Sequence, residues 1–322
     1  MSPLKKNLVI GTRGSKLALW QANHIAESIR TRYPSVEVTI VRIVTTGDRI
    51  LDVPLAKIGG KGLFTKELET AMLQGEIDLA VHSLKDMPTE LPPGLTLAAV
   101  TRRADPGDAL ISPRFSTLDE LPSGARVGTS SLRRRAQLLH YRPDLLISDL
   151  RGNLDTRLNK VRTQELDAII LAVAGLKRLG WEQDISQVLP HSICLPAVGQ
   201  GALAIEARQD DVEVLELLSF LNDQETRAAV FAERAFLRVI EGGCQVPVGV
   251  YGEISGQRLS LSALIASVDG QTMIKDQVCG DAADGEALGD ELAKRMLAAG
   301  GREILAALED FTVTGGNHSE ER

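Results

Sequence analysis

The stretch VIGTRGSKLA at residues 9–18 decides the fold, because VGTSSLRRRA at residues 127–136 repeats its pattern. In each stretch an apolar strand runs into a Gly-Thr loop, a hydroxyl residue that can cap a helix, and a helical sequence. Two further pairs match in the same order, residues 38–48 with 145–155 and residues 76–81 with 165–170. Three ordered matches predict two similar α/β domains.

The first hundred residues alternate between strand and helix patterns. Strands are predicted at residues 7–11, 36–44 and 77–81, and helices at residues 15–31 and 65–73. This alternation predicts a mostly parallel sheet with helices on both faces.

Two short stretches predict crossings between the two domains. They are TRRADP at residues 101–106 and LPAVGQG at residues 195–201, after which residues 202–208 return to the first sheet as a strand. Two linkers between α/β domains form a hinged cleft, which is a usual place for a ligand.

From about residue 222 the pattern changes to that of a small α+β domain. It comprises a helix at 225–240, three strands at 246–254, 258–266 and 272–279, and a helical stretch at 286–308. The predicted domains are therefore 1–101 with 202–219, then 106–195, then 222–313, followed by a disordered tail at 314–322.

The composition is that of a globular protein, with 43% hydrophobic and 25% charged residues, and it lacks an apolar run that could span a membrane. The N-terminus does not resemble a targeting segment, so we expect a cytoplasmic protein. Three cysteines far apart predict neither a disulfide framework nor a metal site. The net charge of −7 argues against nucleic-acid binding. Residues 126–162, however, hold nine Arg or Lys against three Asp, which indicates a site for a specific anion.

Five arginines occupy matching loops of the two repeats. Arg13 lies in the first Gly-Thr loop, and Arg133 and Arg134 lie in the first turn of the second helix. Cations oppose the dipole at a helix N-terminus, so their presence there favours an anion bound between them. Arg151 and Arg157 follow the next strand, at the edge where open α/β sheets bind ligands.

Three other segments are candidates, each with a plainer alternative. HSLKDMP at 82–88 places a hydroxyl, a cation and a carboxylate in one loop, although Lys85 and Asp86 could be a surface pair. Residues 45–64 could be a mobile lid or a plain surface loop; their GGKG lacks the spacing of a P-loop. Cys244 follows two glycines and could be a reactive thiol or a buried structural one.

Seven motifs, in this order, resemble those of the porphobilinogen deaminase family. They are GTRGSKLAL at 11–19, GKGLFTKEL at 60–68, AVHSLKDMP at 80–88, GTSSLRR at 128–134, RGNLDTR at 151–157, LPAVGQG at 195–201 and GGCQVP at 242–247. The resemblance covers about residues 7–310, and none of the quoted positions departs from the family's pattern.

The resemblance implies a transferase of porphyrin and heme biosynthesis, a hydroxymethylbilane synthase. Domains one and two would have the fold of type II periplasmic-binding-protein-like proteins, and domain three would carry a dipyrromethane cofactor on Cys244 through a thioether. Four porphobilinogens would be added head to tail with loss of ammonia, and water would then release the linear hydroxymethylbilane. The partners implied are porphobilinogen and the growing oligopyrrole; the protein would be a monomer that passes its product to the next enzyme of the pathway.

The chemistry explains why such residues are needed. Each pyrrole unit carries an acetate and a propionate, and buried carboxylates are costly unless they are paired. The reaction passes through cationic pyrroles, which a fixed carboxylate can stabilise; Asp86 resembles the family's residue in that role. The thiolate of Cys244 is the natural nucleophile for the primer.

The resemblance assigns the candidate residues to three groups. The catalytic residues implied are Asp86, Lys85 and Arg13. The cofactor-binding residues implied are Cys244, Arg133, Arg134, Ser83, Lys85, Asp86, Thr129, Ser131 and Gly152. The residues implied for the substrate and growing chain are Arg13, Ser15, Arg151, Arg157, Lys57, Lys61, Phe64 and Gln200.

Two rival classes remain open on the residues alone. A non-catalytic hinged anion-binding protein would explain the duplication and the arginines, but not the third domain with its GGC; mass spectrometry separates the cases, because only the deaminase carries two covalent pyrroles. A cysteine hydrolase would need a His partner for Cys244, and no motif supplies one.

Overall fold

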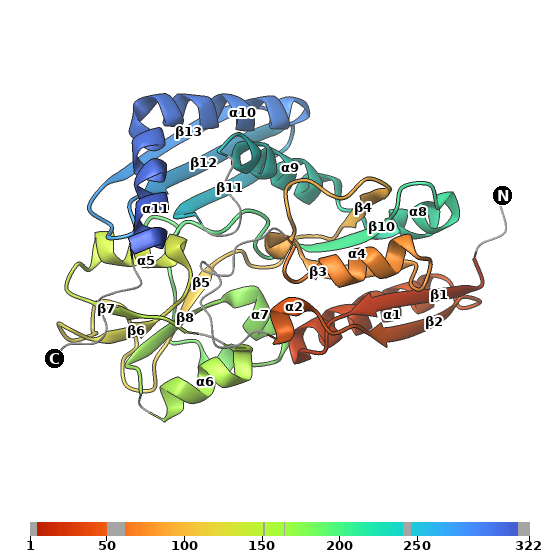
Figure 1. Cartoon of the computed structure of the whole chain (residues 1–322), viewed down its shortest axis with the longest axis horizontal. Helices are drawn as coiled ribbons and strands as arrows, with labels where there is room; N and C mark the ends of the chain where they lie inside the picture. The colour runs from red at the N-terminus through yellow and green to blue at the C-terminus, as the bar shows by residue number, and fades with distance from the viewer. Residues whose placement is uncertain (1–4, 50–61, 151, 164, 241–245, 315–322) are drawn as a thin grey trace.

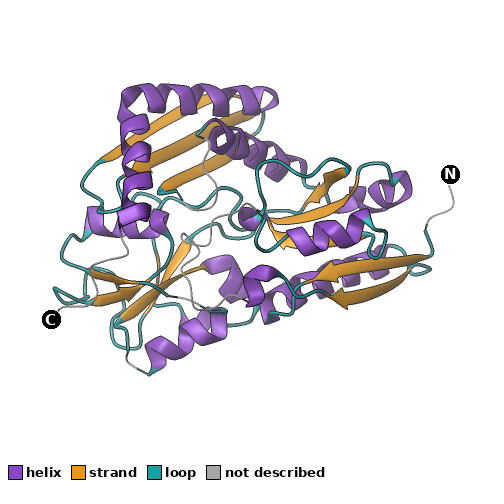
Figure 2. Ribbon diagram, viewed as in Figure 1, coloured by secondary structure: helices purple, strands orange, loops and turns teal. Residues whose placement is uncertain are grey.

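The computed structural model describes residues 5–49, 62–150, 152–163, 165–240 and 246–314. It contains three sheets, each with its own helices (Figures 1 and 2). None of the helices in these ranges is long and apolar enough to cross a bilayer.

The first sheet has five strands in the order β2-β1-β3-β10-β4. Their bounds are β1 Asn7–Thr12, β2 Glu37–Arg42, β3 Leu79–Ser83, β4 Leu95–Val100 and β10 Leu203–Arg208. Strand β1 is parallel to β2 and β3, but β10 is antiparallel to both β3 and β4. Strands β1, β2, β3 and β4 therefore run in the same direction, and the expectation of a mostly parallel sheet is confirmed. Only β10 is reversed, because it comes back from the second sheet and enters from the opposite end.

The second sheet repeats this arrangement in the order β7-β6-β8-β5-β9. Its bounds are β5 Asp108–Ile111, β6 Arg126–Gly128, β7 Leu146–Ser148, β8 Ala168–Ala172 and β9 Gln187–Val188. Strand β6 is parallel to β7 and β8, and β5 is antiparallel to β8 and β9, as β10 is in the first sheet. The three sequence matches thus fall on equivalent strand pairs, and the prediction of two similar α/β domains is confirmed.

Helices surround both sheets. The first sheet is accompanied by α1 Lys16–Arg32, α2 Thr46–Arg49, α4 Lys66–Leu73, the 3₁₀ turn η1 Leu84–Asp86, α8 Val212–Leu218 and η3 Ser219–Leu221. With the second go α5 Leu132–Tyr141, α6 Leu154–Arg162, α7 Val173–Arg178 and η2 Glu182–Asp184. The apolar side of α1, with Ile25 and Ile29, packs on Leu8 and Ile10 of β1 to form the first core.

The third unit contains an antiparallel sheet, β11-β12-β13, and three helices. Its elements are α9 Gln224–Val239, β11 Val248–Ser255, β12 Arg258–Ala266, β13 Met273–Asp281, η4 Ala282–Asp284, α10 Gly285–Met296, η5 Leu297–Gly301 and α11 Arg302–Thr314. The stretch expected to be helical, 286–308, is helical but is divided into α10 and α11 at Gly300, whose left-handed φ of 108° kinks the helix.

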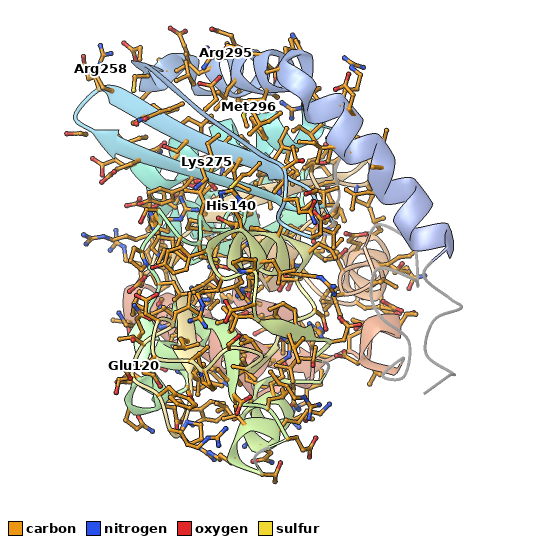
Figure 3. All side chains as sticks on the ribbon, turned by 90° about the vertical axis from the view of Figure 1, so that its left-hand side faces the viewer. Glu120, His140, Arg258, Lys275, Arg295 and Met296 are labelled. Carbon is orange, nitrogen blue, oxygen red and sulfur yellow. The ribbon has the colours of Figure 1, made fainter. Side chains whose placement is uncertain are left out.

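Helix α10 lies on the outer side of this unit and has one polar side and one apolar side (Figure 3). Arg295 is half exposed and bonds Asp276 of β13, whereas the adjacent Met296 is fully buried in the core. The unit also contacts the second sheet's helices: the Nδ1 of His140 in α5 donates to the carbonyl oxygen of Gly270 at 2.9 Å. The β12–β13 turn therefore lies directly against α5.

Candidate active site

A cleft of about 490 Å³, continuous with solvent, lies between the elements of the first two sheets. Leu17 of α1 faces residues of α6 and α7 across it, and Ser83 with Lys85 enters from the end of β3. The rest of the lining comes from Arg134 of α5, the end of β8 and the returning linker, residues 200–202. The cleft thus forms where the sequence predicted one, beside the crossings between the two domains.

The charged side chains that line this cleft are all positive among the described residues. Among the described residues, its lining includes four cations and no carboxylate; the cations are Lys85, Arg134, Arg157 and Arg178. Cations gathered in a partly desolvated space favour anionic ligands, and guanidinium groups pair with carboxylates through two parallel hydrogen bonds. The arrangement is therefore suited to a ligand with several carboxylates.

The charged form of Lys85 is disfavoured by burial and by a neighbouring cation. Burial and the nearby Arg134 lower the pKa of its ammonium group to about 8, although Asp86 and Asp108 act in the opposite direction. Its Nζ donates to the Oε1 of Gln200 at 3.4 Å. A bound carboxylate would offset this repulsion and favour the charged lysine.

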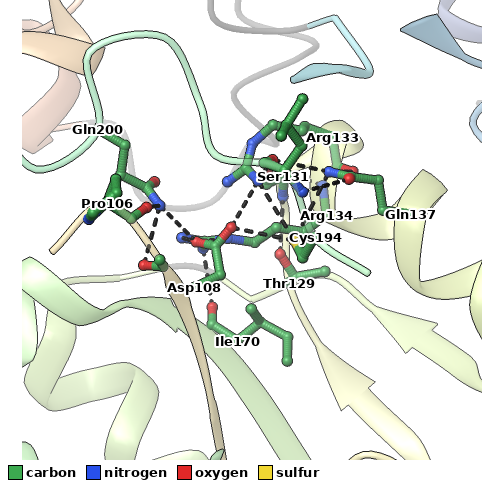
Figure 4. A network of polar contacts seen from close by, with 12 residues as sticks. Pro106, Asp108, Thr129, Ser131, Arg133, Arg134, Gln137, Ile170, Cys194 and Gln200 are labelled. Carbon is green, nitrogen blue, oxygen red and sulfur yellow. Dashed lines mark hydrogen bonds and ion pairs between the residues drawn. The ribbon is translucent and has the colours of Figure 1, made fainter. Parts of the chain in front are cut away.

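A buried polar network lies beside the cleft (Figure 4). Its centre is Asp108 at the start of β5, which is fully buried. Its Oδ1 accepts from Arg134 Nε at 3.0 Å, Arg134 Nη2 at 2.6 Å and Gln200 Nε2 at 3.0 Å. Its Oδ2 accepts from Arg133 Nη1 at 2.7 Å and from the Cys194 thiol at 3.2 Å. Burial alone would raise the pKa of Asp108, but the two guanidinium groups lower it far below its usual range.

The network fixes both arginines to the backbone as well. Arg133 Nη1 donates to the carbonyl oxygen of Leu195 at 2.6 Å, and Arg134 Nη1 donates to that of Ile170 at 3.0 Å. Both side chains are almost fully buried, but only Arg134 reaches the cleft lining. Cys194 has its pKa raised to about 12 by burial and by Asp108, so it is an unreactive thiol.

Arg13 takes part in a different cluster. Its Nη2 lies 2.5 Å from Asp48 Oδ1, and its guanidinium lies 4.1 Å from the ring centroid of Phe64. Burial opposes ionisation of Asp48, but the hydrogen bonds from Arg13 and Thr45 lower its pKa. The structure thus brings Arg13 and Phe64 together, and neither is part of the cleft lining.

The predicted hydroxyl groups are helix caps or loop ties. Ser15 accepts from Ala18 N at 3.3 Å at the start of α1, and Ser131 accepts from Arg134 N at 3.4 Å at the start of α5. The Oγ1 of the buried Thr129 accepts from Ser131 N at 3.2 Å. These bonds satisfy backbone donors at the helix ends and hold the arginine-bearing turn in place.

Three further predicted residues, Ser83, Asp86 and Gly152, lie at or next to the cleft. Ser83 accepts a hydrogen bond from Gln21 Nε2 at 2.8 Å, and Asp86 is exposed at the end of η1, next to Lys85. Gly152 has a φ of 104°, and its carbonyl oxygen accepts from Arg157 Nε at 2.8 Å. The left-handed backbone at Gly152 therefore orients Arg157, which lines the cleft.

Four predicted site residues lie outside the described residues: Lys57, Lys61, Arg151 and Cys244. The predicted tail at 314–322 also falls almost wholly outside them.

Sequence reasoning missed three residues of these clusters. Arg178, in the last turn of α7, lines the cleft and donates to the carbonyl oxygen of Gly201 at 2.7 Å, and burial lowers its pKa to about 10. A cation there is easily taken for a dipole partner at a helix C-terminus. Asp108 and Asp48 were missed because nothing local marks a carboxylate as an arginine partner. Asp108 does follow the predicted crossing directly, which was a usable signal.

Two family models and two closely similar sequences point to the same family. The family model described as "Porphobilinogen deaminase, dipyromethane cofactor binding domain" matches residues 8–216, and "Porphobilinogen deaminase, C-terminal domain" matches residues 227–298. A porphobilinogen deaminase of Geotalea daltonii is 55% identical over 301 residues, or 94% of each chain. One of Trichlorobacter lovleyi is 56% identical over 300 residues, or 93% of this chain and 96% of its own. Among solved structures, the methionine binding protein MetQ aligns with 74% of this chain and 96% of its own, at 15% identity and a TM-score of 0.44.

Proposed function

The chain belongs to the porphobilinogen deaminase family, and on this premise we propose which of its residues carry out the reaction. The protein is a transferase, a hydroxymethylbilane synthase, whose cofactor is dipyrromethane. It condenses four porphobilinogens with loss of ammonia and releases the linear tetrapyrrole. A non-catalytic binding protein is therefore not the better interpretation.

The single observation that carries the assignment of residues is the cleft with four cations and no carboxylate among its described lining residues. Dipyrromethane brings four carboxylates, two from each of its pyrroles, and each added porphobilinogen brings two more. The lowered pKa of Lys85 supports this fit, because burial and then the nearby Arg134 disfavour its charged form, and a bound carboxylate would favour it. The residues present therefore suit the cofactor.

We assign binding of these carboxylates to Arg134, Arg157, Arg178 and protonated Lys85. Arg133 and Asp108 would hold Arg134 in place, since Asp108 accepts from both guanidinium groups. Arg13, stacked on Phe64 and held by Asp48, would meet the incoming porphobilinogen. A preset orientation of these groups reduces the cost of ordering each new unit.

When bound, the cofactor supplies a primer to which new pyrroles are joined, and Cys244 is proposed as the residue that carries it. Asp86 is proposed to accept hydrogen bonds from pyrrole N–H groups and to stabilise positive charge that develops on the rings. Its position supports this role: it is exposed and adjacent to Lys85, which lines the cleft. One fixed carboxylate can then serve each repetition of the reaction.

Three broader points are part of the proposal. The domains would be 1–101 with 202–219, then 106–195, then 222–313. The protein would act as a monomer in the cytoplasm and pass hydroxymethylbilane to the next enzyme.

The test is product formation from porphobilinogen by cofactor-loaded Asp86→Asn. Loss of the charge should lower kcat on the order of 100- to 1,000-fold. Asp86→Glu keeps the charge but moves it by about one methylene, so it should fall between wild type and Asp86→Asn. Asp184→Asn, which alters an ion pair with the exposed Arg162, is the matched control and should keep normal turnover.

Circular dichroism and the mass of the bound cofactor establish that each variant is folded and loaded. Turnover within a few-fold of wild type in loaded Asp86→Asn would remove Asp86 from the mechanism.

A further inference from the structure

Helix α9 lies against the η1 loop, which bears Asp86. Two residues on one side of α9 make the contact. Val230 packs with Leu84 and Met87 in one buried cluster. One turn later, Arg234 Nη2 donates to the carbonyl oxygens of Pro88 at 2.7 Å and Thr89 at 3.0 Å.

Arg227, on the same side of the helix, contacts strand β4 instead, where its Nη1 donates to the carbonyl oxygen of Leu97 at 3.3 Å. Arg234 is therefore the residue that binds the Asp86 loop through hydrogen bonds, and it is only 6% exposed. A buried guanidinium on two carbonyl oxygens fixes distance and direction more narrowly than apolar packing does.

The other side of α9 belongs to the third unit. Ala232 and Phe236 pack in the core formed with β11, β12 and α10. The helix ends at Val239, and Cys244 follows it by five positions in the sequence. One helix therefore contacts the loop of the proposed catalytic carboxylate and ends five positions in sequence before the proposed cofactor-bearing cysteine.

We propose that Arg234 is a positioning residue for the reaction: by binding the backbone at Pro88 and Thr89, it sets the Asp86 loop relative to the helix that precedes Cys244. This inference rests on the proposed function. Asp86 is exposed, and its carboxylate accepts no hydrogen bond from a side chain within the described residues. The position of Asp86 therefore depends on how its loop is anchored. Arg234 anchors the carboxyl end of that loop, two residues after Asp86.

The test compares Arg234→Met, Arg234→Gln and Arg234→Lys. Methionine keeps the apolar stem and removes the donors, and glutamine is too short to reach both carbonyl groups. Both should lower kcat about 10- to 100-fold, since a displacement of about 1 Å at a reacting group can cost roughly 100-fold. Cofactor content by mass spectrometry and the KM for porphobilinogen should stay within about twofold. Arg234→Lys retains donors and should recover at least part of kcat.

Arg238→Met is the matched control, one turn further along α9. Its guanidinium pairs with Glu286 on the surface at 3.1 Å, so its loss should leave kcat and cofactor content unchanged. Melting temperatures separate stability from positioning. If Arg234 only stabilises the fold, Arg234→Met and Arg234→Gln should lower the melting temperature but keep a normal kcat in the folded, cofactor-loaded fraction. That result would overturn the inference. If Arg234→Met does not fold, Arg234→Gln and Arg234→Lys give the same comparison.

Asp86→Asn is measured in parallel to separate the two proposals. If Asp86→Asn loses turnover while Arg234→Met and Arg234→Gln do not, only the positioning role fails. If Asp86→Asn is active, the proposed role of Asp86 fails first, and the inference about Arg234 fails with it.

Discussion

Asp108 holds Arg134 through two N–H groups on a single carboxylate oxygen, at 3.0 Å from Nε and 2.6 Å from Nη2. The carboxylate comes from the first strand after the crossing, and the guanidinium from the first turn of the α5 helix. The hydrogen bonds orient Arg134 toward the cleft, and the carboxylate of Asp108 partly neutralises the charge of its guanidinium group. Arg133 takes the second oxygen, so one carboxylate serves two buried cations.

Removing the charge of Asp108 should destabilise the fold. Asp108→Asn leaves two buried guanidinium groups without their counter-ion, which typically costs about 3–5 kcal/mol. Urea unfolding at pH 7 of protein carrying Cys244→Ala measures this without a bound primer. Asp184→Asn, in an exposed ion pair, should cost less than about 1 kcal/mol. Equal stability of Asp108→Asn and its parent would show that the network is not a source of stability.

Lys85 should give the cofactor-free protein a characteristic pH dependence. Its pKa of about 8 in the folded protein, set by burial and by Arg134, lies below the ordinary value of 10.5. Below pH 8 the lysine is charged in both states, and holding it charged in its buried site disfavours folding. Between pH 8 and 10.5 the folded protein has released a proton that the unfolded chain still binds, so this cost falls as the pH rises and disappears above 10.5.

Lys85→Met in the Cys244→Ala background should accordingly be more stable than its parent at pH 7, by up to about 3 kcal/mol. The advantage should shrink by about 2 kcal/mol between pH 7 and 9.5. Urea unfolding at both values checks it. A difference that stays constant over this range would contradict the lowered pKa of Lys85.

Only one of the three cysteines should carry the cofactor. Cys244→Ala should lose the covalent dipyrromethane mass, whereas Cys194→Ala and Cys279→Ala should keep it. The structure gives a reason for the first control, because Cys194 is fully buried and its pKa is raised to about 12. Cys279 is exposed on β13, so its variant tests whether exposure is sufficient. Intact-protein mass spectrometry decides, and an adduct that persists in Cys244→Ala would remove Cys244 as the attachment site.

The sequence by itself determined the duplicated α/β architecture and the family. Strand and helix patterns depend on local periodicity, and the Gly-Thr loops with Ser15 and Ser131 as caps repeat in both halves. Long motifs in a fixed order then identified the family without any knowledge of contacts. The position of Arg157 in the cleft followed from the rule that ligands bind at the carboxyl ends of strands.

The tertiary structure alone decided which charges are paired and which face the cleft. Asp108 and Arg134 are 26 positions apart, and Arg234 lies 146 positions from the carbonyl group that it binds at Pro88. No periodicity specifies such partners, because they meet only when separate elements pack together. Burial decided the rest: Arg178 and Lys85 have lowered pKa values, since desolvation depends on everything that surrounds a side chain and not on its neighbours in sequence.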